Sequence, residues 1–262
     1  MINAMDGGIR VNRESLVRTL ERQILAGTIG VGQSLPSERR LAEHFNMSRT
    51  VVREALSVLA ERGLIEIATG KGAYVRAADP TATAGVLVNS MRGRHVTARH
   101  VIRGRKLLES ETSWLAAENR TDEDLARMER SLESLEGGDS VLDRVRSDLE
   151  FHLAVARSCH DPVLEAMFGS ISELTAELML RSLSDTDVAA RGLPQHRQIL
   201  DAIRANDPAA ARDAMVAHLN VASEHYGADL DRDLAIVAQR QLKGLEGADH
   251  SLAEIFKLAM DA

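Results

Sequence analysis

Cysteine is almost missing from this chain, since Cys159 is its only one. A lone thiol excludes a disulfide scaffold and argues against a thiolate metal site, so we interpret Cys159 as a small buried apolar residue. The first residues lack the charged-then-apolar pattern of a signal peptide, and no apolar run approaches the length of a membrane span. We therefore expect a cytoplasmic protein with no membrane partner.

Aromatic residues are also scarce, at 3% of the chain, so aliphatic residues and Met must fill the core. An excess of positive charge is missing as well, because the net charge is −7. Its distribution is uneven: residues 1–78 hold 11 Lys and Arg against 8 Asp and Glu, and the remainder holds 21 against 31. A weakly basic head on an acidic body favours docking to nucleic acid through one face.

Two short helices separated by a tight turn are predicted in the basic head. Ser37 can cap a helix over about residues 38–45, where Glu38 in the first turn suits the helix dipole. Ser48 can cap a second helix, and Gly63 can end it. This order is that of a helix-turn-helix, whose second helix enters the major groove of DNA with its N-terminus first.

The groove-facing residues are therefore predicted to be Ser48, Arg49, Thr50 and Arg53. Arg can contact guanine edges through two hydrogen bonds, whereas Ser and Thr mostly hold phosphates. These residue types predict a double-stranded DNA partner.

A β-hairpin is predicted after the second helix, with strands at residues 64–68 and 73–76 around a glycine-rich turn. Gly70 lets the backbone approach DNA closely, and Lys71 supplies a cation, so the hairpin suits a wing that rests on the minor groove or its phosphates. The alternative is an ordinary surface hairpin.

These motifs resemble the winged helix-turn-helix of GntR-type bacterial regulators over about residues 10–77. The similarity lies in residues 35–42 (LPSERRLA), 48–56 (SRTVVREAL) and 63–65 (GLI). It implies DNA contacts from Arg39 together with Ser48, Arg49, Thr50 and Arg53, and it places Gly70 and Lys71 at the wing tip. A first helix carrying Leu16, Leu20 and Ile24 would support them from behind.

Beyond the head we find no convincing strand, so the fold class is mainly α: a winged helix-turn-helix followed by an all-α antiparallel helical bundle. Helix-start signals include a Thr121 capping box and the pairs Asp161-Pro162 and Asp207-Pro208, and Pro194 is expected to open another helix. The expected helices span about 81–93, 97–119, 122–136, 140–158, 162–182, 194–205 and 208–226. The expected parts are the head (1–78), a linker with a first connecting helix (79–97), an effector and metal domain (98–226) and a C-terminal helical extension (227–262).

Four polar residues of the body form a candidate metal site. Asp148 and His152 are four apart and project from one helical face. His196 and His218 lie on consecutive helices, about equally far from the turn near Asn206, so they would meet at one depth of a helical hairpin. Three imidazoles and a carboxylate suit zinc, nickel, iron or manganese. The alternative is that all four are hydrogen-bonded core residues.

The body also resembles the FCD ligand-binding domain of the FadR subfamily over about residues 98–226. The similarity lies in residues 105–109 (RKLLE), 115–117 (LAA), 148–152 (DLEFH) and 194–196 (PQH), and in His218. It implies that Asp148, His152, His196 and His218 hold a divalent metal, with zinc expected first. Members that bind acyl-CoA lack this set, so the resemblance implies a sensor of small molecules.

A metal with open positions attracts a carboxylate, and an arginine beside it would complete a clamp. We expect Arg105 in that role; the alternative is a surface salt bridge with Glu109. His225 is either an outer group of the site or solvated, and we find no partner pattern for His95 or His100.

We expect a homodimer on a pseudo-palindromic operator, acting as a repressor, in which a small carboxylate effector shifts the placement of the heads. Two alternatives stay open: a metal-dependent enzyme that activates water, and an architectural DNA-binding dimer with no effector.

Overall fold

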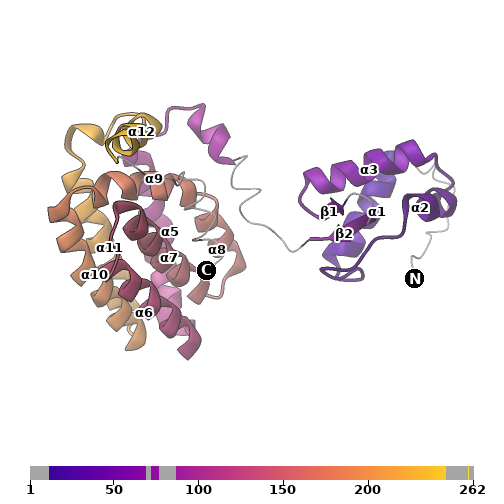
Figure 1. Ribbon diagram of the computed structural model, residues 1–262. Helices are drawn as coiled ribbons and strands as arrows, with labels where there is room; N and C mark the ends of the chain where they lie inside the picture. The colour runs from indigo at the N-terminus through magenta and orange to yellow at the C-terminus, as the bar shows by residue number, and fades with distance from the viewer. Residues whose placement is uncertain (1–11, 69–71, 77–86, 246–258, 260–262) are drawn as a thin grey trace. The chain divides into compact units, whose positions relative to one another are not determined.

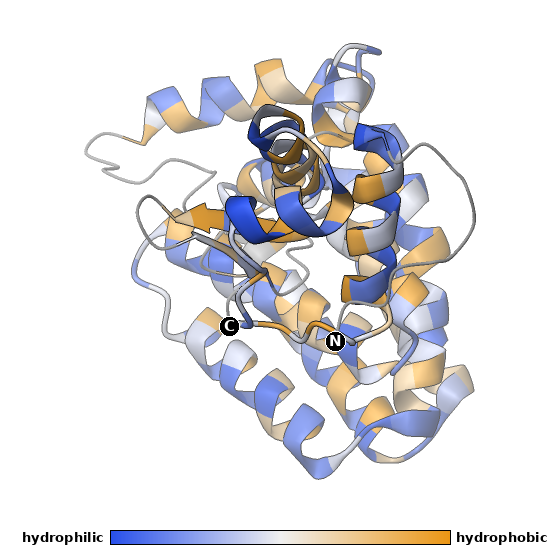
Figure 2. Ribbon diagram, turned by 90° about the vertical axis from the view of Figure 1, so that its right-hand side faces the viewer, coloured by the Kyte–Doolittle hydropathy of each residue, from blue (hydrophilic) through white to orange (hydrophobic). Residues whose placement is uncertain are grey.

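The computed structural model describes residues 12–68, 72–76, 87–245 and 259, and the chain divides into two compact units, residues 1–82 and 83–262. Figure 1 shows the helices and the single hairpin by label. Figure 2 shows hydrophilic and hydrophobic residues mixed along the same helices, as expected of amphipathic helices that bury one face.

The head is built from three helices and a hairpin: α1 (Arg13–Leu25), α2 (Glu38–Phe45), α3 (Arg49–Glu61), β1 (Ile65–Ala68) and β2 (Gly72–Val75). Ser37 accepts a hydrogen bond from the Arg40 amide, and Ser48 accepts one from the Val51 amide, so both predicted caps are confirmed. Gly63 follows α3 with φ of +73°, a backbone conformation that favours glycine.

The two strands pair antiparallel, with Ile65 opposite Val75 and Ala68 opposite Gly72. Their inner side chains join one apolar core with the helices, in which Leu16, Leu20 and Leu59 are fully buried. The turn carrying Gly70 and Lys71 lies outside the described residues. The fold class of a helical protein with a small β-hairpin wing is confirmed.

The body consists of helices among the residues that the structure describes. They are α5 (Ala98–Asn119), α6 (Asp122–Glu136), α7 (Val141–Ser158), α8 (Pro162–Gly169), α9 (Ser172–Leu183), α10 (Thr186–Arg204), α11 (Pro208–His225), the 3-10 turn η1 (Gly227–Asp229) and α12 (Leu234–Gly244). Helix α5 packs against α7 and α11, while α6 packs on α7 and α10 on α11. These five long helices bury one aliphatic core with only Phe151 as an aromatic member, and Cys159 is buried as expected.

Two predicted helices differ from the structure. The span 162–182 is two helices, α8 and α9, because Gly169 ends the first and the hydroxyls of Ser170 and Ser172 donate to the carbonyls of Met167 and Phe168. Helix α10 begins before Pro194 and contains it, so Pro194 opens no helix. The turns before it stay helical although proline removes one hydrogen bond, and Val188 within them is buried.

Of the predicted connecting helix 81–93, residues 87–93 are described; 87–92 are helical and Gly93 lies in a turn. Of the extension 227–262, the described part contains η1 and α12. Among the described residues, no helix has both the length and the apolar character required to cross a bilayer.

Candidate functional site

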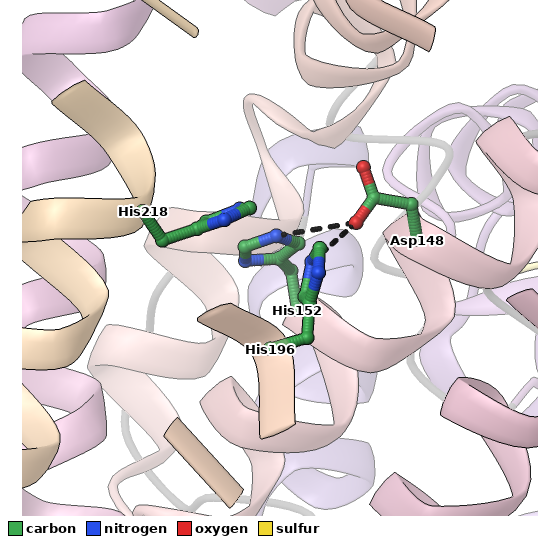
Figure 3. Close-up of side chains that lie close together, drawn as sticks. All are labelled: Asp148, His152, His196 and His218. Atoms are coloured by element: carbon green, nitrogen blue, oxygen red, sulfur yellow. Dashed lines mark ion pairs between the residues drawn. The ribbon is translucent and has the colours of Figure 1, made fainter. Parts of the chain in front are cut away.

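The four candidate metal ligands come together in the body. Asp148 and His152 extend from α7, one turn apart, while His196 comes from α10 and His218 from α11 (Figure 3). One ligand atom from each residue lies within 4.8 Å of the others. Ligands 2.0–2.2 Å from an ion at the centre lie about 3–4 Å apart, so small movements of these side chains would bring all four to a single shared cation.

The contacts within this cluster converge on one carboxylate oxygen. His196 Nε2 lies 2.6 Å and His152 Nε2 3.6 Å from Asp148 Oδ1. The His196 and His218 ring centroids are 4.2 Å apart, and the His152 ring stacks on that of His218 at 5.2 Å. Asp148, His152 and His196 are buried and His218 is partly exposed, so only His218 reaches toward solvent.

Three polar atoms of the cluster are buried: Asp148 Oδ1 and His196 Nε2 face each other at 2.6 Å without hydrogen-bond geometry, and His218 Nδ1 has no hydrogen-bond partner in the described structure. Leaving a buried polar atom unpaired costs about 1–3 kcal/mol. The other nitrogen of His196, Nδ1, lies 3.0 Å from the Gly192 carbonyl oxygen and must carry its proton to donate there. Its Nε2 therefore presents a lone pair to the cluster, so these residues fit a divalent metal ion.

The pKa shifts of Asp148 and His218 suit a metal. The pKa of His152, in contrast, is raised because Glu109 outweighs the effect of burial, so a metal would displace a proton from that ring. Burial would raise the pKa of Asp148, but His196 and His152 outweigh it and hold that pKa well below the usual value. Burial, reinforced by the two neighbouring imidazoles, lowers the pKa of His218 well below its ordinary value. An ionised carboxylate and a neutral imidazole are the states in which these side chains bind metals.

Arg105, the predicted effector-binding residue, lies beside this cluster on α5 and is 2% exposed. Its Nε donates to Glu109 Oε1 at 2.6 Å, and its Nη2 lies 3.2 Å from His152 Nε2. The alternative of a surface salt bridge is therefore wrong about location: the pair with Glu109 exists, but both partners are buried.

Glu109 was not singled out as a site residue from the sequence. It is 1% exposed, and its second oxygen contacts His152 Nδ1. Burial would raise its pKa, but Arg105 and His152 lower it to about 2. Its four-residue spacing from Arg105 was visible in the sequence, whereas its contact with His152 on another helix was not.

A small cavity opens next to the cluster, with about 40 Å³ of space for water. Arg105, Asp148, His196 and His218 form its polar wall. Most of its other lining is apolar, including Leu178 and Met179 of α9. Few polar groups on an apolar lining are typical of a small-molecule pocket, although at this volume the cavity holds only a few waters.

The remaining singled-out histidines lie apart from the cluster. His225 engages the Val221 carbonyl through Nδ1 and Arg191 through Nε2, so both ring nitrogens are occupied elsewhere. His100 caps the start of α5 through the Thr97 amide, and His95 contacts Asp233.

In the head, Ser48, Arg49, Thr50 and Arg53 are exposed at the N-terminal half of α3. Arg53 Nε and Nη2 donate to the two oxygens of Glu38 at 3.1 and 3.0 Å, and Arg49 lies 3.6 Å from the same carboxylate. Arg39 on α2 is exposed and pairs with Glu43 at 2.9 Å. From the sequence, Glu38 was assigned only a helix-dipole role, and its contact with both α3 arginines was missed.

Comparison with known proteins agrees with these two units. Residues 12–75 match the bacterial regulatory proteins of the gntR family, and residues 100–221 match the FCD domain. The chain is 32% identical over 200 residues to the HTH-type transcriptional regulator LutR of Bacillus subtilis (strain 168), covering 74% of this chain and 91% of that protein.

It is also 32% identical over 209 residues to the Galactonate operon transcriptional repressor of Escherichia coli (strain K12), covering 77% and 90% of the two chains. A solved structure named Streptococcus agalactiae GntR superposes with a TM-score of 0.64 at 26% identity, covering 80% of this chain and 97% of that one. These matches cover both units and most of the chain, and they agree on one protein family. The chain belongs to the GntR family of bacterial regulatory proteins with a C-terminal FCD domain, and it is a DNA-binding transcriptional regulator, not an enzyme.

Proposed function

We propose that this regulator is a repressor whose FCD domain binds a divalent metal and a small organic acid, and that the acid changes its affinity for its operator. The observation that carries the proposal is the convergence of one ligand atom each from Asp148, His152, His196 and His218 to within 4.8 Å of one another, beside Arg105. Arrangement as a homodimer on a pseudo-palindromic operator in the cytoplasm belongs to the same proposal.

Asp148, His152, His196 and His218 would hold the metal, and zinc is the ion we expect first because three imidazoles and a carboxylate suit it. Nickel, iron and manganese accept the same donors. When bound, the metal supplies positive charge and an open position for a carboxylate oxygen.

The effector is proposed to be a small carboxylic acid. Arg105 lines the cavity and can present N–H donors to a carboxylate, although Glu109 occupies its Nε. The small size of the cavity favours a compact acid over a long acyl chain. The name of the galactonate operon repressor, a relative that covers most of this chain, supports a sugar acid as the first compound to test.

A route from the cavity toward the head runs through α9. Leu178 of α9 lines the cavity and also belongs to the apolar cluster that contains Val88. Arg92 donates to Glu173 at 2.8 Å and to Glu177 at 2.5 Å, both on α9. Val88 and Arg92 lie in helical residues 87–92, the first described segment after the head, so a shift of α9 would be passed to the chain that leads to the head.

The test is thermal unfolding of the full chain with zinc, with an organic acid, and with both. We expect the largest stabilisation when both are present, since a ligand that binds only the folded state stabilises it by about 2.7 kcal/mol at 100 times its Kd. Asp148→Asn should abolish both the metal content and the joint effect. A wild-type chain that binds no metal would instead favour the architectural dimer, with the four residues as core.

A further inference from the structure

Glu109 occupies the point where the metal cluster and the effector arginine meet. It lies on α5, 1% exposed, and its carboxylate has two neighbours. Oε1 accepts from Arg105 Nε at 2.6 Å, and Oε2 contacts His152 Nδ1. Glu109 on α5 thus contacts His152, a proposed metal ligand on α7.

The contact with Glu109 decides which nitrogen of His152 carries the proton. An ionised carboxylate can only accept, so Nδ1 of His152 must donate to it. In the neutral ring that binds a metal, Nε2 then keeps its lone pair, and Nε2 is the atom that lies 3.6 Å from Asp148 Oδ1 in the cluster. A carboxylate behind a ligating histidine orients the ring and increases its basicity.

Glu109 also compensates a cation that stands close to the same ligand atom. Arg105 Nη2 lies 3.2 Å from His152 Nε2 and 3.3 Å from Nδ1, so the guanidinium faces the ring. Without the carboxylate, this buried positive charge would oppose a metal ion, and its N–H would compete for the Nε2 lone pair.

We propose that Glu109 is a positioning residue of the metal centre: it holds His152 in the tautomer whose Nε2 lone pair faces Asp148, and it neutralises Arg105 beside that atom. The inference rests on the proposed metal-binding function. It adds a carboxylate from α5 to the cluster formed by α7, α10 and α11.

The test is Glu109→Gln in the full chain. The Gln amide can turn its oxygen to Arg105 only by turning its NH₂ toward His152, which selects the wrong tautomer. We expect zinc affinity, measured by competition with a chromophoric chelator, to fall about 10- to 100-fold. The absorption spectrum of the Co(II)-loaded protein should change as well, because the geometry of the His152 ligand changes.

Glu111→Gln is the matched control, since Glu111 lies on the same helix and pairs with Arg212 at the surface at 2.5 Å. It should bind zinc like the wild type. If Glu109→Gln does not fold, as judged by circular dichroism, the double variant Arg105→Met/Glu109→Met removes both buried charges while keeping similar volume. Zinc affinity should still fall, because His152 loses the carboxylate that orients it, but by less than in Glu109→Gln, because the opposing charge of Arg105 is removed as well.

The outcomes separate the two proposals. Wild-type protein that binds no zinc, or Asp148→Asn that binds it unchanged, overturns the proposed metal function. Normal zinc binding and an unchanged Co(II) spectrum in the folded Glu109 variants, with wild-type and Asp148→Asn behaving as expected, overturn the role of Glu109 alone.

Discussion

Arg49 and Arg53, the two arginines of α3 that are predicted to contact DNA, share a single carboxylate in the head, that of Glu38. The hydrogen bond from Arg53 is the main cause that lowers the pKa of Glu38, so the carboxylate is ionised at neutral pH. Because Nε and Nη2 of Arg53 both donate to Glu38, that carboxylate fixes the plane of the guanidinium group. A fixed plane favours base reading over loose phosphate contact.

We therefore predict that Glu38→Gln weakens discrimination between the operator and other DNA sequences, while it strengthens binding to DNA of any sequence. Releasing two cations should tighten binding to a random duplex and steepen its salt dependence, by roughly 0.9 in slope for each additional phosphate that the protein neutralises. Fluorescence anisotropy with a selected operator and a random duplex, at two salt concentrations, measures both effects. The control is Glu14→Gln, which removes one negative charge beside Arg18 on α1. It should leave the ratio of operator affinity to random-duplex affinity unchanged.

Side-chain hydrogen bonds stabilise the first turn of helix α6 in the body. Helix α6 begins with a capping box in which Asp124 Oδ2 accepts from the amide and the hydroxyl of Thr121, at 2.9 and 2.8 Å. His160 Nε2 lies 2.9 Å from the same oxygen. Burial would raise the pKa of Asp124, but these contacts outweigh it and the pKa is lowered.

Asp124→Ala should lower the free energy of unfolding by about 1–3 kcal/mol at pH 7. Since the pKa of Asp124 is lower in the folded chain than its ordinary 3.8, its stabilisation is present above that value and is lost as pH falls through the folded pKa. Urea unfolding from pH 7 downward should show the difference between wild type and variant shrinking in acid. Glu123→Ala, an exposed neighbour paired with Arg127, should show little effect at any pH.

For the whole molecule, the proposed function requires that a ligand bound in the body alter the DNA affinity of a head that is a separate unit. The described contacts offer a connection within the body, from the cavity through α9 to Arg92. Such coupling between sites typically amounts to about 5- to 150-fold in affinity.

Arg92→Ala is expected to retain metal content and effector binding but to lose most of the effector-dependent change in operator affinity. Calorimetry of effector binding and gel-shift titration with and without effector measure the two properties separately. Arg99→Ala, which breaks an exposed pair with Asp231, should keep the full response. An Arg92→Ala protein that responds like the wild type would exclude α9 and Arg92 as the route.

The sequence by itself determined what depends on neighbours along the chain. Ser37 and Ser48 cap the head helices because a hydroxyl reaches an amide three residues away, and apolar spacing placed α5, α6 and α7 within a residue or so of their observed ends. Even the meeting of His196 with His218 followed from equal distances to the turn at Asn206, because helical rise per residue is constant.

Tertiary structure alone decided what depends on contacts between distant segments. Glu38 could not be matched to Arg53, nor Glu109 to His152, because 15 and 43 residues separate the partners and no periodicity relates one element to another. The extent of α10 was also decided this way: its first turns lie before Pro194, the predicted start of the helix, and Val188 within them is buried in the body. Local sequence preferences determine where helices and strands form, whereas packing between these elements determines which charged side chains come into contact.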